Sequence, residues 1–150
     1  MRRAIALSAE KMREGVGGPF GAVIARDGTV IACGHNQVTS AKDPTAHAEV
    51  VAIRAACEAL GSFSLAGCEI YTSCEPCPMC LGAIYWARLD CVYYANTRAD
   101  AAAIGFDDAR IYQEFQAGID DRSVPLIRLG SEEAKLVFQE WLAKPDKIRY

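Results

Sequence analysis

The sequence predicts an α/β protein in which helices cover both faces of a central mixed sheet of five strands. Three observations lead to this fold class. Helical and extended segments alternate along the chain, and the extended segments are short and apolar. There is no repeat, low-complexity tract or long linker. A chain of 150 residues, 51% of them hydrophobic, is long enough for one core without disulfides. We therefore expect a three-layer α/β/α sandwich that forms a single domain over residues 1–150.

The first elements follow from patterning and turn chemistry. Residues 2–14 have an amphipathic pattern that predicts a helix. Residues 20–26 and 29–33 flank Asp27-Gly28, a dipeptide typical of a tight turn between two strands. We expect a β-hairpin here.

The remaining elements alternate in the same way. We expect a helix, a strand, a helix and a strand, at residues 45–60, 68–72, 78–88 and 91–94. The helix at 45–60 is rich in strong helix formers and follows Asp43-Pro44, which suits a helix start. A fifth strand is expected at 124–129. A last helix follows it, with Ser131 as its cap and two glutamates in its first turn.

Four residues match an open catalytic zinc site in type and spacing. His47-Ala48-Glu49 is followed, twenty-seven residues after the glutamate, by Pro76-Cys77-Pro78-Met79-Cys80. The imidazole and the two thiols would leave the fourth tetrahedral position of Zn²⁺ open for water. Glu49 would then carry protons without being a ligand. This pattern is typical of zinc-dependent nucleobase deaminases.

Both halves of the motif fall at predicted helix starts. His47 and Glu49 are two residues apart, so both can serve one site only if the N-terminal end of their helix points at it. Cys77 stands where a helix N-cap would, Pro78 suits the first helical position, and Cys80 is one turn further on. Two positive helix ends meeting at the metal would favour thiolate over thiol.

Other interpretations of the cysteines remain. Cys74, Cys77, Cys80 and His47 could form a closed structural zinc site, although that leaves Glu49 without a role. A disulfide framework fits less well, because seven cysteines is an odd number and no feature indicates secretion. The other four lie in apolar runs and are expected to be small buried hydrophobes: Cys33, Cys57, Cys68 and Cys91.

Charge and hydropathy narrow the class of protein further. The 16 lysines and arginines are scattered, and against 19 acidic residues they give a net charge of −3. This disfavours a polynucleotide substrate, which usually requires a clustered basic surface. No run approaches the roughly 20 apolar residues of a membrane span. We expect a soluble, cytoplasmic protein that acts on a small molecule and has no membrane partner.

Four segments, in chain order, resemble the bacterial guanine deaminases of the cytidine-deaminase fold. They are residues 17–24, 43–49, 72–88 and 105–108. The zinc motif alone is shared by cytidine, cytosine, tRNA-adenosine and guanine deaminases, so it indicates only the superfamily. The Tyr-Trp-Ala-Arg sequence at 85–88, the Gly-Phe-Asp-Asp sequence at 105–108 and the aromatic residue Tyr150 resemble the guanine-deaminase branch.

The resemblance implies roles for particular residues of this chain. It implies one Zn²⁺ per chain on the ligands of the zinc motif, with Glu49 as the general acid/base. It makes Asn36 and Asp108 substrate contacts, and Phe20 and Trp86 aromatic walls of the pocket.

The resemblance also implies a homodimer with a domain swap. In that family the C-terminal segment crosses to a dimer partner and closes its active site. Residues 145–150 would then place Tyr150 over the substrate of the neighbouring subunit.

Each of these assignments has a simpler structural alternative. Asp107 or Asp108 more often caps a following helix, and Asn36, close to a glycine, more often stabilises a turn. Aromatic residues such as Phe20 and Trp86 are more often part of the core, and a terminal tyrosine more often lies in a frayed chain end.

The predicted reaction is the hydrolytic deamination of guanine to xanthine and ammonia. Asp108 suits guanine because a carboxylate accepts from both N1–H and the 2-amino group. It also suits the delivery of a proton to the leaving amine. The alternatives are a tRNA-specific adenosine deaminase, a deaminase of cytosine or of another aminopurine or aminotriazine, and a zinc-stabilised binding module without turnover.

Overall fold

The chain forms two compact units, Met1–Ala109 and Arg110–Tyr150. A computed structural model describes residues 1–149. His47, Glu49, Cys77 and Cys80 all lie in the first unit. The single domain expected over residues 1–150 stays a prediction. Within residues 1–149, no helix is both long and apolar enough to cross a membrane.

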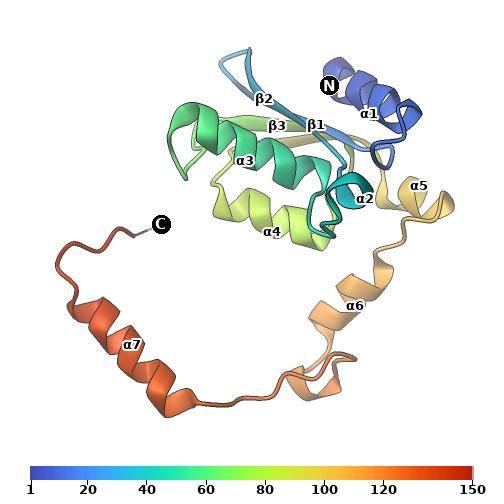
Figure 1. Cartoon of the computed structure of the whole chain (residues 1–150). Helices are drawn as coiled ribbons and strands as arrows, with labels where there is room; N and C mark the ends of the chain where they lie inside the picture. Colours follow the sequence, from blue (N-terminus) through green and yellow to red (C-terminus); the bar gives the residue numbers. More distant parts are fainter. Residues whose placement is uncertain (150) are drawn as a thin grey trace. The chain divides into compact units, whose positions relative to one another are not determined.

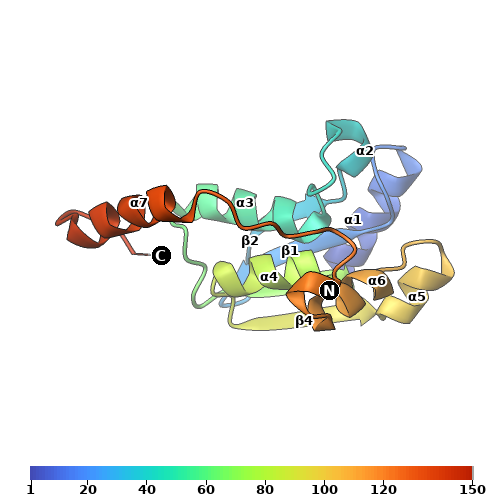
Figure 2. The ribbon, with the colours of Figure 1, turned by 90° about the horizontal axis from the view of Figure 1, so that it is seen from below.

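The first unit is built on a four-stranded mixed sheet with strand order β2-β1-β3-β4 (Figure 1). The strand β1 (Gly21–Arg26) pairs antiparallel with both β2 (Thr29–His35) and β3 (Glu69–Cys74). The strand β3 pairs in parallel with β4 (Cys91–Asn96). Figure 2 shows β4 at the edge of the sheet. The mixed α/β class is therefore confirmed, with four strands rather than five.

Helices lie on both faces of this sheet. The helices α3 (Ala48–Leu60) and α4 (Pro78–Trp86) cover one face, and α1 (Arg2–Arg13) covers the other. A Cβ atom at Gly34 would lie 2.2 Å from the Ala48 carbonyl oxygen in α3, and one at Gly21 would lie 2.4 Å from the Ala4 carbonyl oxygen in α1. Glycine at these two strand positions therefore lets both helices approach the sheet. The short helices α2 (Val38–Ala41) and α5 (Arg98–Ala103) were not predicted.

The core lies between the sheet and the α3/α4 layer. The largest fully buried apolar side chains there are Ile24, Leu65 and Ile70. In α3, the buried residues Ala48, Ala52 and Ala56 recur at every fourth position and form one small-residue stripe against the strands. Close packing of this kind fixes the position of α3, and therefore of its N-terminal end, where His47 and Glu49 lie.

The predicted burial of the cysteines is only partly correct. All seven are free thiols, and Cys68 is buried in the core as expected. Cys33 and Cys57 are partly buried. Cys91 is exposed, contrary to the prediction, because it lies on the edge strand β4.

The second unit contains α6 (Ala109–Gln116), which starts at the unit boundary, a 3-10 turn at Ile119–Asp121 and α7 (Ser131–Ala143). Ser123 joins the segment after the 3-10 turn to α6. Its hydroxyl accepts from the Arg110 guanidinium at 3.0 Å, and its N–H donates to the Glu114 carboxylate at 2.9 Å. The last helix is capped by Gly130, so the prediction that Ser131 is the cap is wrong by one residue.

The predicted fifth strand is also wrong. Residues 124–129 have no strand structure and pair with no neighbour within the described chain. The apolar side chains of this stretch are exposed: Val124, Leu126, Ile127 and Leu129. The local pattern of an apolar run indicates β propensity, but a strand forms only where another strand receives its backbone hydrogen bonds.

Candidate active site

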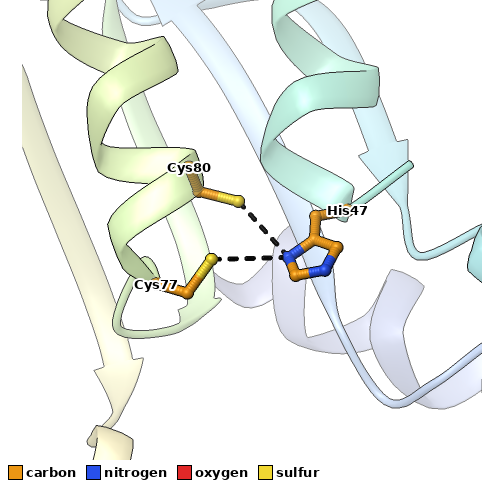
Figure 3. Close-up of side chains that lie close together, drawn as sticks. All are labelled: His47, Cys77 and Cys80. Carbon is orange, nitrogen blue, oxygen red and sulfur yellow. Dashed lines mark hydrogen bonds between the residues drawn. The ribbon is translucent and has the colours of Figure 1, made fainter. Parts of the chain in front are cut away.

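The imidazole of His47 lies beside the thiols of Cys77 and Cys80 (Figure 3). The His47 Nδ1 atom is 3.6 Å from the Cys77 Sγ atom and 3.5 Å from the Cys80 Sγ atom. All three potential ligand atoms lie within 4.8 Å of one another. Zn–S bonds of about 2.3 Å and Zn–N bonds of about 2.0 Å separate N and S ligands of a tetrahedral centre by roughly 3.6 Å. The group therefore fits a Zn²⁺ ion with one position open.

Two helix N-termini meet at this group, as the sequence predicts. His47 is the N-cap of α3, and Cys77 is the N-cap of α4 with Pro78 as the first helical residue. Both caps have extended backbone conformations, which directs their side chains past the ends of the helices. The positive ends of the helices favour anionic ligands here. The helix predicted from residue 45 begins three residues later, at Ala48.

The two thiols differ in their tendency to ionise. A hydrogen bond from Cys80 and the interaction with His47 together lower the pKa of Cys77 to about 4, although burial opposes them. The same hydrogen bond, together with burial, raises the pKa of Cys80 far above its ordinary value. Hydrogen bonding to Cys77 raises the pKa of His47. Two adjacent thiolates repel, and a divalent cation is the partner that would allow both to ionise.

Cys74 does not join this group. Its Sγ atom donates to the Thr97 carbonyl oxygen at 3.6 Å, and burial raises its pKa to about 11. Within residues 1–149, the only cluster of potential metal ligands that contains a cysteine holds two of them. The geometry therefore favours the open three-ligand site over a closed Cys₃His site.

Glu49 is buried next to the ligand group. It is the second residue of α3 and only 8% exposed. Burial raises the pKa of its carboxyl group, whereas its own backbone N–H and a hydrogen bond with Cys80 oppose that rise. A buried carboxyl group beside an open ligand position can exchange protons with a molecule held there.

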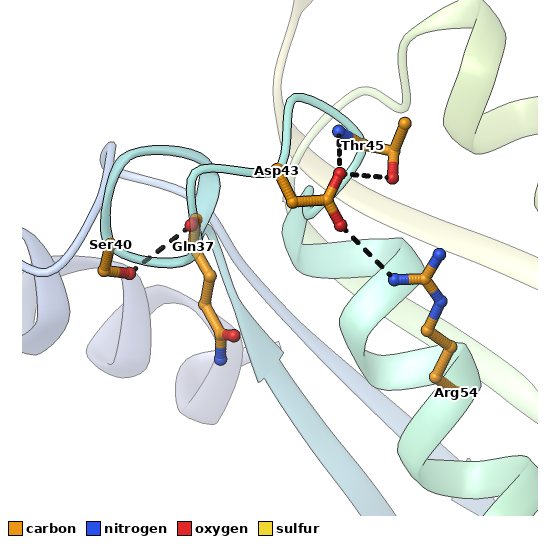
Figure 4. Close-up of polar contacts among 5 residues, drawn as sticks. All are labelled: Gln37, Ser40, Asp43, Thr45 and Arg54. Atoms are coloured by element: carbon orange, nitrogen blue, oxygen red, sulfur yellow. Dashed lines mark hydrogen bonds and ion pairs between the residues drawn. The ribbon is translucent and has the colours of Figure 1, made fainter.

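A hydrogen-bonded turn leads the chain into His47 (Figure 4). One carboxylate oxygen of Asp43 accepts from the Thr45 N–H at 2.8 Å and from its hydroxyl at 2.7 Å. The other oxygen lies 3.7 Å from the Arg54 guanidinium in α3. Asp43 therefore fixes the turn before the helix and joins it to α3, instead of capping the helix itself.

Asn36 is buried just after β2, with its side-chain carbonyl fully engaged. The Oδ1 atom accepts from the N–H groups of Gly18 at 3.2 Å and Val38 at 3.3 Å. These bonds assign the orientation of the amide, since only the oxygen can accept. Asn36 does stabilise a turn, yet its NH₂ group remains the part that can donate to a ligand.

The two neighbouring aspartates before α6 have different environments. Asp107 accepts from the Ala109 N–H at 2.9 Å and so satisfies the helix start. Asp108 is partly buried, and burial raises the pKa of its carboxyl group. Arg98 opposes that rise, and the charge of Cys77 adds to it, so Asp108 lies within electrostatic range of the zinc motif.

The aromatic residues are placed in three different ways. The ring of Phe20 packs edge-to-face against Phe106, with centroids 4.9 Å apart. Trp86 ends α4, about 13 Å along the helix axis from the Cys77 end. Together with Phe63 it lines a surface depression of about 280 Å³. The role of Trp86 as a wall of the substrate pocket stays a prediction. Tyr150 lies outside the described residues.

Sequence reasoning missed two residues at the site. Glu75 accepts from the Arg98 N–H at 2.9 Å and donates its own N–H to the Asn96 carbonyl at 2.8 Å. These two hydrogen bonds join the loop between β3 and α4, which is called the cysteine loop below, to the segment that leads to Asp108. Phe106 makes the contact with Phe20 across 86 residues of sequence. No local pattern signals either contact.

The fold and the ligand group define the class of protein. Residues 1–96 match the model of the cytidine and deoxycytidylate deaminase zinc-binding region. The chain belongs to this family of zinc-dependent deaminases.

Particular members of the family are similar to this chain over different shares of its length. The chain is 51% identical to guanine deaminase of Bacillus subtilis strain 168 over 150 residues, covering 100% of this chain and 96% of that protein. An X-ray structure of guanine deaminase from Bacillus subtilis superimposes with a TM-score of 0.96 at 52% identity, covering 99% of this chain and 95% of that one. A tRNA-specific adenosine deaminase of Agrobacterium fabrum is 50% identical over 86 residues, 57% of each chain.

Proposed function

We propose that the protein hydrolyses guanine to xanthine and ammonia. The full-length similarity to a guanine deaminase carries this proposal, because it includes the last third of the chain. The match to a tRNA-specific adenosine deaminase covers only 57% of the chain. The ligand group, Glu49 and Asp108 supply the chemistry that the reaction needs.

The metal ligands are assigned to the Nδ1 atom of His47 and the Sγ atoms of Cys77 and Cys80. When bound, Zn²⁺ supplies Lewis-acid activation of a water molecule near neutral pH. Glu49 accepts a proton as the water oxygen bonds to C2 of guanine, and it returns that proton to a ring nitrogen. The new hydroxyl group on C2 then gives up its proton to the exocyclic nitrogen, the bond between C2 and that nitrogen breaks, and the nitrogen leaves as ammonia. Asp108 suits this second transfer.

Guanine offers matching partners for two groups of the site. Its N1–H and 2-amino groups are adjacent donors, and a carboxylate at Asp108 accepts from both. The NH₂ group of Asn36 donates to an acceptor of the purine. Adenine and cytosine lack the adjacent donor pair, so the partly buried carboxylate of Asp108 would lose these hydrogen bonds when facing them.

We also propose that the protein is a homodimer, as the family resemblance implies. The helix α7 exposes large apolar side chains: Leu136, Val137, Phe138, Trp141 and Leu142. The edge strand β4 has no partner on its outer side among the described residues. Apolar surface of this extent on α7 is unusual in a monomer, and a second copy of the chain could cover it. Sedimentation equilibrium measures the association directly.

The tail that follows α7 is proposed to act in the partner subunit. Residues 145–149 carry Ile148, which is exposed, and they lead to Tyr150. A tail that covers a pocket excludes water and strengthens the electrostatic interactions inside it. The cytoplasmic location expected from the sequence stays a prediction.

Ammonia release from a panel of substrates tests the reaction. The purified protein is incubated with guanine, adenine, cytosine and a tRNA that carries the anticodon adenosine. Release from guanine alone supports the proposal, and release from adenine, cytosine or tRNA instead of guanine overturns it in favour of that substrate. No release from any member, at full zinc content, would indicate a binding module without turnover. The Glu49→Gln variant is the matched inactive control.

A further inference from the structure

We infer that Phe106 is a positioning residue that sets the separation between Asn36 and Asp108. This inference rests on the proposed function, in which these two groups bind the same purine. The hydrocarbon ring of Phe106 carries no group that can bind a metal or transfer a proton. Its effect would come through the backbone segments that it holds together.

The ring of Phe106 lies on the loop before β1. It meets Phe20 edge-to-face, with centroids 4.9 Å apart and ring planes at 89°. Its Cζ atom would lie 3.3 Å from a Cβ atom at position 18, so the ring rests directly on Gly18. Edge-to-face pairs have a preferred geometry, so this contact orients one segment against the other.

Gly18 and Phe20, which the Phe106 ring contacts, both form hydrogen bonds with Asn36. The Gly18 N–H donates to the Asn36 Oδ1 atom at 3.2 Å. The Phe20 carbonyl accepts from the Asn36 N–H at 3.0 Å. A shift of the loop under Phe106 would therefore move both the backbone and the amide of Asn36.

The segment that carries Phe106 also carries Asp108, two residues later. Its beginning is fixed to the cysteine loop, because Glu75 accepts from the Arg98 N–H at 2.9 Å. A capping box between Thr97 and Asp100 starts α5 at the same point. The contact of Phe106 with Phe20 then holds the other end of the segment, immediately before Asp108.

Loss of the Phe106 ring should affect function more than stability. The side chain is 47% exposed, so its removal leaves no closed cavity in the core. Asp108 would stay attached but could move relative to Asn36. A displacement of about 1 Å in a positioned group can lower a rate about 100-fold.

A double-mutant cycle on kcat/KM for guanine tests this role. The variants are Phe106→Ala, Asp108→Asn and the double variant, all as full-length zinc-loaded protein. We expect Phe106→Ala to lower kcat/KM by about 10- to 100-fold in the wild-type background. Because it acts through Asp108, we expect less than about a 3-fold effect in the Asp108→Asn background. Zinc content should remain at one ion per chain.

The control is Ile104→Ala, which removes another exposed apolar side chain from the same segment and should leave kcat/KM unchanged. Equal effects of Phe106→Ala in both backgrounds would overturn the inference, as would wild-type activity of that variant. Phe106→Leu gives a second measurement, with a smaller loss, if the alanine variant folds poorly. If the wild type deaminates adenine or cytosine instead of guanine, the proposed substrate fails, and the same cycle on that base decides the role of Phe106.

Discussion

The carboxylate of Asp107 accepts a hydrogen bond from the backbone N–H of Ala109 at 2.9 Å. This bond satisfies a donor at the start of α6 that has no partner inside the helix. The neighbouring carboxylate of Asp108 is therefore not needed for that purpose. It is partly buried instead, where the charge of Cys77 influences its pKa.

Alanine variants of the two aspartates should separate stability from catalysis. We expect Asp107→Ala to lower the free energy of unfolding by about 0.5–2 kcal/mol and to leave guanine kinetics nearly unchanged. Asp108→Ala should lower kcat/KM sharply with little change in Tm, since it removes a substrate contact. Thermal unfolding and steady-state kinetics on both variants provide the comparison. The reverse pattern would make Asp108 the capping residue.

Metal content should distinguish the ligand cysteines from Cys74. We expect Cys77→Ala to lose both zinc and activity, because it removes one of three protein ligands. Cys74→Ala should keep one zinc per chain, because its thiol points to the Thr97 carbonyl. Elemental analysis of the dialysed proteins measures this. Loss of zinc from the Cys74 variant would indicate a closed structural site.

The Glu49→Gln variant should separate proton transfer from metal binding. It removes the proton carrier but no ligand, so zinc content should stay at the wild-type level. Turnover of guanine should fall by at least about 10²- to 10⁴-fold, as is typical for the loss of one general acid/base. Substantial residual turnover would assign the proton transfer to another group.

Asn36 offers a test of its donor group alone. In Asn36→Asp, one side-chain oxygen can still accept from the N–H groups of Gly18 and Val38, but the NH₂ donor is gone. We expect kcat/KM for guanine to fall by about 10-fold or more, because an acceptor then faces an acceptor. Tm should fall as well, because a carboxylate replaces an amide at a buried position. Asn36→Ala should also lower Tm, since it leaves two backbone N–H groups unpaired. Unchanged kinetics in the aspartate variant would restrict Asn36 to its turn.

Complementation between subunits tests the action of the tail. Deletion of residues 146–150 should lower activity much more than zinc content or Tm. Mixing this deletion with Glu49→Gln should restore activity, because one pocket of each heterodimer then has both an intact Glu49 and an intact tail. Subunit exchange is verified by mass spectrometry of differently labelled chains. Verified heterodimers without recovered activity would mean that the tail does not act in the partner.

Much of the first unit could be predicted from local sequence. The hairpin at Asp27-Gly28 formed as expected, with φ values of 50° and 75°, because this turn type needs left-handed residues. Cys77 and Pro78 mark the start of α4, because proline fits the first position of a helix. Such signals depend only on neighbours in the chain, so they can be recognised without the fold.

The sequence by itself determined the α/β class, most element positions and the residue types of the zinc motif. Only the tertiary structure decided which groups meet: Glu75 with the Arg98 amide, Phe106 with Phe20, and Asp107 rather than Asp108 at the start of α6. It also decided that residues 124–129 form no strand. The physical reason is common to all of these. Ring contacts, ladder hydrogen bonds and burial depend on atoms brought close by the whole fold, whereas turns and caps depend on adjacent residues.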